Sequence, residues 1–174
     1  MRIFIGIRPT DEFRAALSVL QNHLRTFGVT GRYLDPSNLH MTLAFIGEWP
    51  DDAVPLLPRV VHPFSLALSR PGMFPKAKVL WAGVDSSEPL EYLAGQVRQF
   101  LDEHEIPYDP KPFFPHITLV RKPSVPAGAA LSEIRIPAAS MPVKEVCLYR
   151  SQRGENGMEY TVIRSSLSGK PDSE

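Results

Sequence analysis

Leu39-His40-Met41-Thr42-Leu43-Ala44-Phe45-Ile46 and Phe113-Phe114-Pro115-His116-Ile117-Thr118-Leu119-Val120 are the two stretches of this 174-residue chain from which its fold can be argued. Each places the pattern His-x-Thr-Leu in an apolar run that is typical of a β-strand. His40 and His116 are 76 residues apart, and the same offset relates the two threonines, the two leucines and a proline ahead of each strand. One offset shared by several positions indicates an internal duplication of about 75 residues.

The segments around both stretches follow one order, in which a strand and a helix precede a turn-rich approach (33–38 and 107–112) to the His-x-Thr-Leu strand. The predicted elements are a strand over 1–7, a helix capped by Thr10, a strand over 78–84, a helix capped by Ser86 or Ser87, and strands over 64–69, 143–150 and 159–164. Two similar lobes related by a pseudo-twofold axis are therefore expected. They form a single domain over 1–164, followed by a polar C-terminal tail over 165–174.

The composition excludes several classes of protein. Lys and Arg number 19 and so do Asp and Glu, so a net charge of zero argues against a protein that coats long polyanions. The single cysteine, Cys147, can form neither an intramolecular disulfide nor a thiolate metal site. Neither a signal peptide nor a membrane-length apolar run is seen, so a reducing cytoplasm is the expected compartment.

Side chains alternate between the two faces of a strand, which assigns a face to each residue of the motif. His40, Thr42 and Ala44 are predicted on one face of the first strand, opposite a core face of Leu39, Met41, Leu43 and Phe45. His116 and Thr118 are predicted together on the second strand, opposite Pro115, Ile117 and Leu119. If the two non-core faces meet in a groove, two imidazoles flank whatever binds there.

Two histidines on either side of a substrate suit in-line displacement at phosphorus. One neutral imidazole takes a proton from the attacking water and an imidazolium on the far side protonates the leaving oxygen. Histidine fits both roles because its ordinary pKa lies near 6.5. The hydroxyls of Thr42 and Thr118 can donate to the non-bridging oxygens of the phosphate. The residue chemistry alone does not distinguish the acid from the base.

The two motifs resemble the paired signature of the 2H phosphoesterases. Wider stretches narrow the resemblance to the RNA 2′,3′-cyclic phosphodiesterases, also known as 2′-5′ RNA ligases; these stretches are Met1 to Ile7, Asn38 to Leu43, Phe45 to Glu48, Phe113 to Arg121 and Leu148 to Ser151. The resemblance implies a bilobal α+β fold with antiparallel sheets around a central groove. It implies hydrolysis of an RNA 2′,3′-cyclic phosphate to a 2′-phosphomonoester, with 2′-5′ ligation of RNA ends as a reverse reaction.

The resemblance also assigns roles to individual residues. His40 is the expected general acid toward O3′, His116 the general base toward water, and Thr42 and Thr118 hold the phosphate. Arg121 matches a basic position after the second motif and is expected to bind phosphate. Strict alternation places Arg121 opposite His116, so it reaches the groove only if the strand ends or bulges near Val120; otherwise it is a solvated side chain.

Other residues offer surfaces for a nucleobase. Phe114 has the same parity as His116 and stands where relatives often carry a basic residue, so a base-stacking surface is expected there. Tyr33 and Tyr149 are further candidates for stacking, although core packing is the competing interpretation. The histidines at 23, 62 and 104 are expected to have no part in the chemistry.

The expected partners are RNA ends or small nucleotides, with no membrane, no obligate protein partner and a monomeric state. No metal is expected, because neither motif supplies an acidic third ligand on the face of its histidine. No Gly-x-Gly-x-x-Gly or Walker-type loop is present, so no nucleotide cofactor is expected. Two alternatives stay open: a phosphodiesterase for small cyclic phosphates or 2′-5′-linked oligonucleotides, and a non-catalytic module that binds RNA ends.

Overall fold

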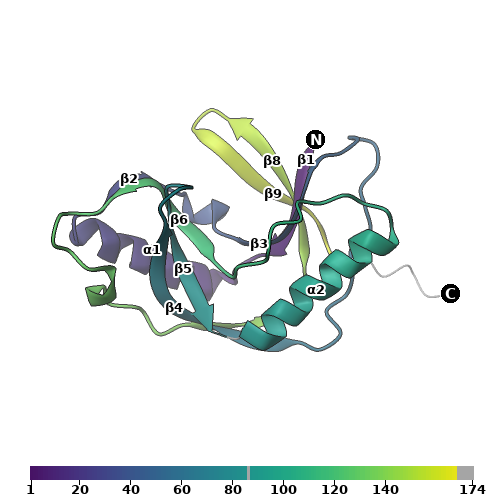
Figure 1. The fold of residues 1–174 in the computed structure, drawn as a ribbon. Coiled ribbons are helices and arrows are strands. Elements are labelled where there is room, and N and C mark those ends of the chain that lie inside the picture. Colours follow the sequence, from purple (N-terminus) through teal and green to yellow (C-terminus); the bar gives the residue numbers. More distant parts are fainter. Residues whose placement is uncertain (86, 168–174) are drawn as a thin grey trace.

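The computed structural model describes residues 1–85 and 87–167, and it contains two antiparallel sheets that face each other across the molecule (Figure 1). The strands are β1 (Arg2–Ile7), β2 (Thr30–Tyr33), β3 (Met41–Glu48), β4 (Phe64–Phe74), β5 (Val79–Asp85), β6 (Ile117–Ser124), β7 (Ser140–Val143), β8 (Cys147–Gly154) and β9 (Gly157–Ser165). The helices are α1 (Asp11–Thr26), α2 (Ser87–Glu103) and two 3₁₀ turns, η1 (Pro36–Asn38) and η2 (Leu131–Glu133). The α+β fold with two lobes is as expected.

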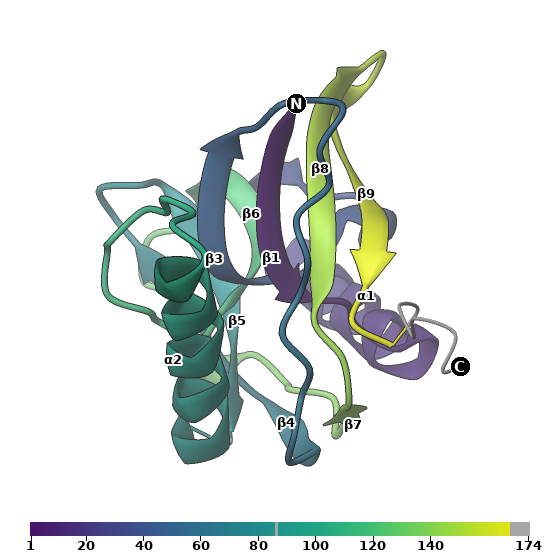
Figure 2. The same cartoon turned by 90° about the vertical axis from the view of Figure 1, so that its right-hand side faces the viewer.

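The two sheets show the duplication in their strand order. The first sheet runs β3-β1-β8-β9 and the second runs β2-β6-β5-β4-β7, so β3, β1 and β8 correspond to β6, β5 and β4. β3 and β6 are both eight residues long and start 76 positions apart. The lobes are not contiguous in sequence, because β4 of the first half lies in the second sheet and β8 of the second half lies in the first (Figure 2).

This exchange corrects one prediction. A single strand was expected over 143–150, but Val143 ends β7 in the second sheet and Cys147 begins β8 in the first. Residues 144–146 carry the chain from one lobe to the other. Sequence patterns also contain no sign of β2, which lies within a stretch interpreted as a helix end and a turn, and which pairs with the outer edge of β6.

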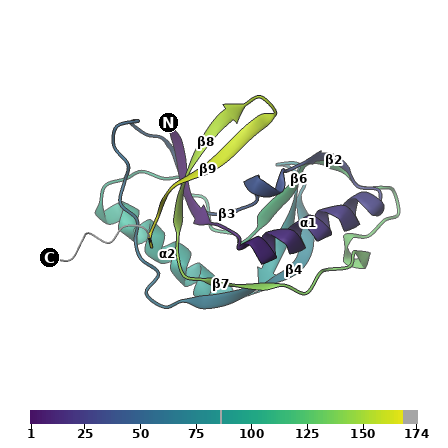
Figure 3. The ribbon, with the colours of Figure 1, turned by 180° about the vertical axis from the view of Figure 1, so that it is seen from behind.

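The helices begin and pack for identifiable reasons. Thr10 caps α1 by accepting a hydrogen bond from the backbone N–H of Phe13 at 3.2 Å, as predicted. Gln21, buried in α1, donates through Nε2 to the carbonyls of Leu34 and Leu119, which anchors α1 to the second lobe. Figure 3 shows α1 beside the strands of this lobe. α2 contacts β3, so each helix covers the sheet that holds the motif strand of the other half of the chain. Of the two predicted caps of α2, Ser86 lies outside the described residues.

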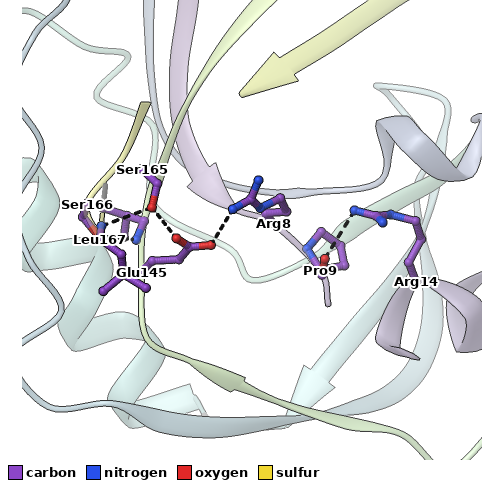
Figure 4. Close-up of polar contacts among 8 residues, drawn as sticks. Arg8, Pro9, Arg14, Glu145, Ser165, Ser166 and Leu167 are labelled. Carbon is purple, nitrogen blue, oxygen red and sulfur yellow. Dashed lines mark hydrogen bonds and ion pairs between the residues drawn. The ribbon is translucent and has the colours of Figure 1, made fainter. Parts of the chain in front are cut away.

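A chain of polar contacts fastens the end of β9 to the rest of the first lobe (Figure 4). Glu145 accepts from Arg8 at 2.9 Å and from the hydroxyl of Ser165, and Ser165 Oγ accepts from the backbone N–H of Leu167 at 3.1 Å. β9 therefore ends at Ser165, and hydrogen bonds continue to Leu167, whose side chain is exposed. Residues 168–174 of the predicted tail lie outside the described residues. No helix among the described residues is long and apolar enough to cross a membrane.

Replacement by alanine is predicted to have opposite effects on stability at Gly6, where β1 packs closely against β3, and at Gly95 in α2. A Cβ at Gly6 would lie 2.5 Å from the carbonyl oxygen of Met41, whereas a Cβ at Gly95, exposed within α2, would meet nothing within 4 Å. Gly6→Ala is expected to lower the free energy of unfolding by roughly 1–3 kcal/mol through strain, and Gly95→Ala to raise it by about 0.5–1 kcal/mol through helix propensity. Urea denaturation checks both, and a Gly6→Ala variant as stable as wild type would contradict the packing described.

Candidate active site

His40 lies directly before β3, and hydrogen bonds hold the segment that precedes it. Asn38 fixes this segment to β9, because its side chain donates to the carbonyl of Met158 at 2.8 Å and accepts from the backbone N–H of Tyr160 at 3.1 Å. The backbone carbonyl of Asn38 is 2.8 Å from Nδ1 of His40. With Nδ1 held as a donor to this carbonyl, the neutral ring carries its lone pair on Nε2.

Aromatic rings enclose the imidazole of His40. Its centroid lies 4.7 Å from the ring of Phe4, 4.9 Å from that of Tyr160 and 5.4 Å from that of Tyr149. Burial lowers the pKa of His40 to about 4, and the positive charges of Arg121 and His116 add to this effect. His40 is therefore neutral in the free protein near neutral pH.

His116 repeats this arrangement before β6. Its Nδ1 is 2.7 Å from the carbonyl of Phe114, two residues earlier, as in the first motif. Phe74 lies edge-on to the imidazole at 5.1 Å, and the rings of Phe114 and Trp81 follow at 6.1 and 6.5 Å. Burial lowers the pKa of His116 as well, against the opposing effect of the Phe114 carbonyl. Both motifs thus present an imidazole whose Nε2 has no hydrogen-bond partner within the described part of the chain.

Two adjoining hollows receive these imidazoles. The His40 hollow has a volume of about 420 Å³ and is lined by Arg2, Phe4, His40, Thr42, Phe45, Arg121, Ser151, Met158 and Tyr160. The His116 hollow has a volume of about 390 Å³ and is lined by Thr42, Leu43, Ala44, Phe45, Phe74, Arg98, Asp109, Lys111, Pro112, Phe113, Phe114 and His116. Thr42 and Phe45 line both, so the hollows are two ends of one groove, with a histidine from each half of the chain.

Two matching β-bulges decide which side chains reach this groove. The pairing of β1 with β3 leaves Leu43 as an extra residue, and the pairing of β5 with β6 leaves Leu119, which is 76 positions later. Each bulge reverses the alternation beyond it. Phe45, predicted in the core, therefore faces the groove, and Ala44, predicted beside His40, is buried with 1% of its surface exposed.

Arg121 lines the His40 hollow because of the second bulge. Strict alternation predicted Arg121 on the opposite face from His116, unless the strand ended or bulged near Val120. A guanidinium nitrogen of Arg121 is 3.5 Å from the hydroxyl of Tyr160. Phe114 lines the His116 hollow with 49% of its surface exposed, as its parity predicted. Thr118, predicted beside His116, is half-buried on β6 opposite Trp81 and is not among the residues that line either hollow.

The remaining candidates lie elsewhere. Tyr149 is 4% exposed and stacks on Phe4 at 4.8 Å, so it is a core residue that supports the His40 hollow. The ring of Tyr33 is covered by the guanidinium of Arg25 at 4.1 Å. None of the histidines at 23, 62 and 104 lines either hollow. Residues 1–85 and 87–167 contain no cluster of three or more His, Cys, Asp or Glu side chains arranged to hold a metal.

Sequence reasoning missed two aromatic residues that shape the His40 hollow. Alternation alone predicts Phe4 in a strand buried on both faces, and Tyr160 as an ordinary residue of the last strand. Phe4 and Gly6 share one face of β1, opposite Ile3 and Ile5. The face that carries Phe4 and Gly6 therefore lacks aliphatic side chains, and this feature of the sequence could have indicated that it lines a groove.

Several known proteins resemble this chain in sequence and in fold. A sequence model of the 2′-5′ RNA ligase superfamily matches residues 3–155. The chain is 34% identical to the RNA 2′,3′-cyclic phosphodiesterase of Thermus thermophilus over 98% of this chain and 92% of that protein. Among solved structures, it resembles the protein TT0787 of Thermus thermophilus (TM-score 0.71, 31% identity, 95% of this chain and 96% of that one). It also resembles Escherichia coli LigT complexed with 3′-AMP (TM-score 0.71, 27% identity, 94% and 95% of the two chains).

Proposed function

This chain belongs to the 2′-5′ RNA ligase superfamily, and we propose from this membership that it hydrolyses RNA 2′,3′-cyclic phosphate ends with His40 and His116 as its proton donor and acceptor. The observation that carries the proposal is the repeated imidazole: each motif fixes Nδ1 on the carbonyl two residues earlier and leaves Nε2 for a substrate in one groove. A module that only binds RNA ends has no need of two such nitrogens.

The proposed reaction is a single in-line displacement. Nε2 of His116 takes a proton from water as the water oxygen bonds to phosphorus, and the P–O3′ bond breaks as Nε2–H of His40 protonates O3′. The products are a 2′-phosphomonoester and a free 3′-hydroxyl. The hydroxyls of Thr42 and Thr118 donate to the non-bridging oxygens, and Arg121 balances the charge that these oxygens gain.

The burial of both imidazoles supports a role for the substrate in setting their charge. His40 must carry a proton to act as the acid, although its pKa in the free protein is about 4. A bound phosphodiester anion favours the imidazolium and so raises the pKa of His40 and His116. Binding of the anionic substrate therefore favours the protonated form of His40, which is the form that can act as the general acid.

The pH dependence of the reaction follows from these pKa values. kcat/KM reports groups of the free enzyme, where burial lowers the pKa of His40 to about 4 and also lowers the pKa of His116, so its optimum is expected on the acid side of neutrality. kcat reports the complex, whose anion raises both pKa values, so its profile is expected at higher pH. Steady-state rates at constant ionic strength from pH 4 to 9 check this. Rates that do not change from pH 5 to 9 would contradict the two-histidine mechanism.

The same groove can join RNA ends. If the 5′-hydroxyl of a second RNA replaces water, the displacement forms a 2′-5′ phosphodiester without ATP, and its reversal regenerates the cyclic phosphate. Water greatly outnumbers RNA ends, so hydrolysis is the proposed main reaction and ligation a minor one. A monomer in the cytoplasm is proposed with it. The single cysteine, Cys147, is buried, and burial raises the pKa of its thiol to about 11, so it is an unreactive free thiol.

A substrate panel tests the proposed function. We expect the highest kcat/KM for an RNA oligonucleotide with a 2′,3′-cyclic phosphate end, and lower values for a nucleoside 2′,3′-cyclic phosphate, a 2′-5′-linked dinucleotide and ADP-ribose 1″,2″-cyclic phosphate. A higher value for one of the small molecules would favour the alternative phosphodiesterase. Tight binding of the RNA end with no turnover would favour the non-catalytic module.

A further inference from the structure

A third hollow adjoins the His40 hollow on the side of β2. This Arg32 hollow has a volume of about 440 Å³ and shares Arg121, Met158 and Tyr160 with the His40 hollow. Its charged lining consists of Arg25, Arg32, Arg121 and Asp35. Three guanidinium groups against one carboxylate make it the basic end of the groove, in a chain whose net charge is zero.

Two of these arginines lie opposite each other on neighbouring strands. Arg32 on β2 is the antiparallel partner of Arg121 on β6, and like charges in this position repel. Neither forms an ion pair with a carboxylate in the part of the chain that the structure describes. Oδ1 of Asp35 accepts from the backbone N–H of Ser37 at 2.9 Å and from its hydroxyl at 2.6 Å, and the described residues show no ion pair between Asp35 and any of the three arginines.

The third arginine is held in place. The guanidinium of Arg25 lies 4.1 Å above the ring of Tyr33 and donates to Oδ1 of Asn22 at 2.7 Å. Tyr33 in turn donates through its hydroxyl to the carbonyl of Val29 at 2.7 Å. A guanidinium fixed in this way loses little freedom when an anion binds, so the hollow is prepared for a phosphate.

We infer that the Arg32 hollow binds the phosphate on the 5′ side of the terminal nucleotide, and that the RNA strand leaves the active site through it. The inference rests on the proposed function, in which O3′ faces His40. The ribose carbon next to C3′ is C4′, which leads through C5′ to the 5′ phosphate, whereas C2′ leads to C1′ and the base. With O3′ toward His40, the 5′ phosphate points to the Arg32 hollow, and the base points to the His116 hollow and Phe114.

The test compares three substrates that differ only on the 5′ side: adenosine 2′,3′-cyclic phosphate, its 5′-phosphorylated form, and the dinucleotide ApA with a 2′,3′-cyclic phosphate end. A charge-assisted contact is expected to raise kcat/KM roughly tenfold for the two substrates that carry the 5′ phosphate. Arg32→Gln should remove most of this advantage, Arg32→Lys should keep part of it, and Arg25→Gln should also reduce it. Arg59→Gln, exposed in the loop before β4, is the matched control and should leave the ratio unchanged.

Each outcome separates the inference from the proposed function. Equal kcat/KM for all three substrates would overturn the inference and leave cyclic phosphate hydrolysis intact. The same would follow if Arg32→Gln lowered all three values by one factor, or if Arg59→Gln lowered the ratio as much. No turnover of any substrate would reject the proposed function together with the inference. The advantage of the dinucleotide should also shrink as salt is raised, because counterions compete for the arginines.

Discussion

Replacing His116 with alanine is expected to lower kcat on an RNA 2′,3′-cyclic phosphate by about 10²–10⁴, and replacing His40 should cost a similar factor, because each removes one proton transfer. The double variant should lose little more than either single variant, since the two groups act in one step. His62→Ala is the matched control, because His62 is exposed and lines neither hollow. Its activity should equal that of wild type.

A diester with a better leaving group separates the two roles. p-Nitrophenolate leaves without a proton, so hydrolysis of bis(p-nitrophenyl) phosphate needs the general base and not the general acid. His40→Ala should therefore lose far less activity on this diester than on RNA, while His116→Ala should lose comparable factors on both. The opposite pattern would assign the acid to His116, and the ribose would then face the aromatic hollow beside Phe114.

Arg121→Met is the second change with a large expected effect. Removing one preorganised charge from the developing oxyanions is expected to lower kcat by about 10²–10³. Arg121→Lys should recover part of the loss, because an ammonium supplies the charge but not the two-pronged geometry of a guanidinium. Arg59→Met controls for the loss of a positive charge elsewhere on the protein.

A readout independent of activity accompanies this prediction. Arg121 is one of the charges that lower the pKa of His40, so the pKa of His40 should rise in the Arg121→Met protein. An NMR titration of the His40 imidazole resonances in the two proteins measures this. An unchanged pKa for His40, together with unchanged activity, would mean that Arg121 does not act in the groove.

The sequence alone predicted that His40 and His116 line one groove, because a polar His-x-Thr pair in an apolar strand recurs at one offset. It was not enough to place residues beyond Leu43 and Leu119. A bulge adds one residue to a strand without any required residue type, so a strict period of two misplaced Phe45 and Ala44 and left the position of Arg121 open.

The exchange of strands between the lobes could not be predicted from the sequence either. Alternation shows that a strand has a buried face, but it does not show which sheet supplies the partner. The sequence therefore suggested that β4 and β8 each belong to the lobe formed by their own half of the chain. In the structure, β4 lies in the second sheet and β8 lies in the first. β2 was missed because its four residues, Thr30–Tyr33, include a glycine and carry no alternating apolar pattern.

The most direct test of the central claim is turnover of an RNA oligonucleotide with a 2′,3′-cyclic phosphate end by the wild-type protein in EDTA. Identifying the product by ³¹P NMR shows which P–O bond breaks. We expect complete conversion to a 2′-phosphate with no effect of the chelator, since two imidazoles supply both proton transfers. A 3′-phosphate product, activity abolished by EDTA, or no conversion by the folded protein would contradict this claim.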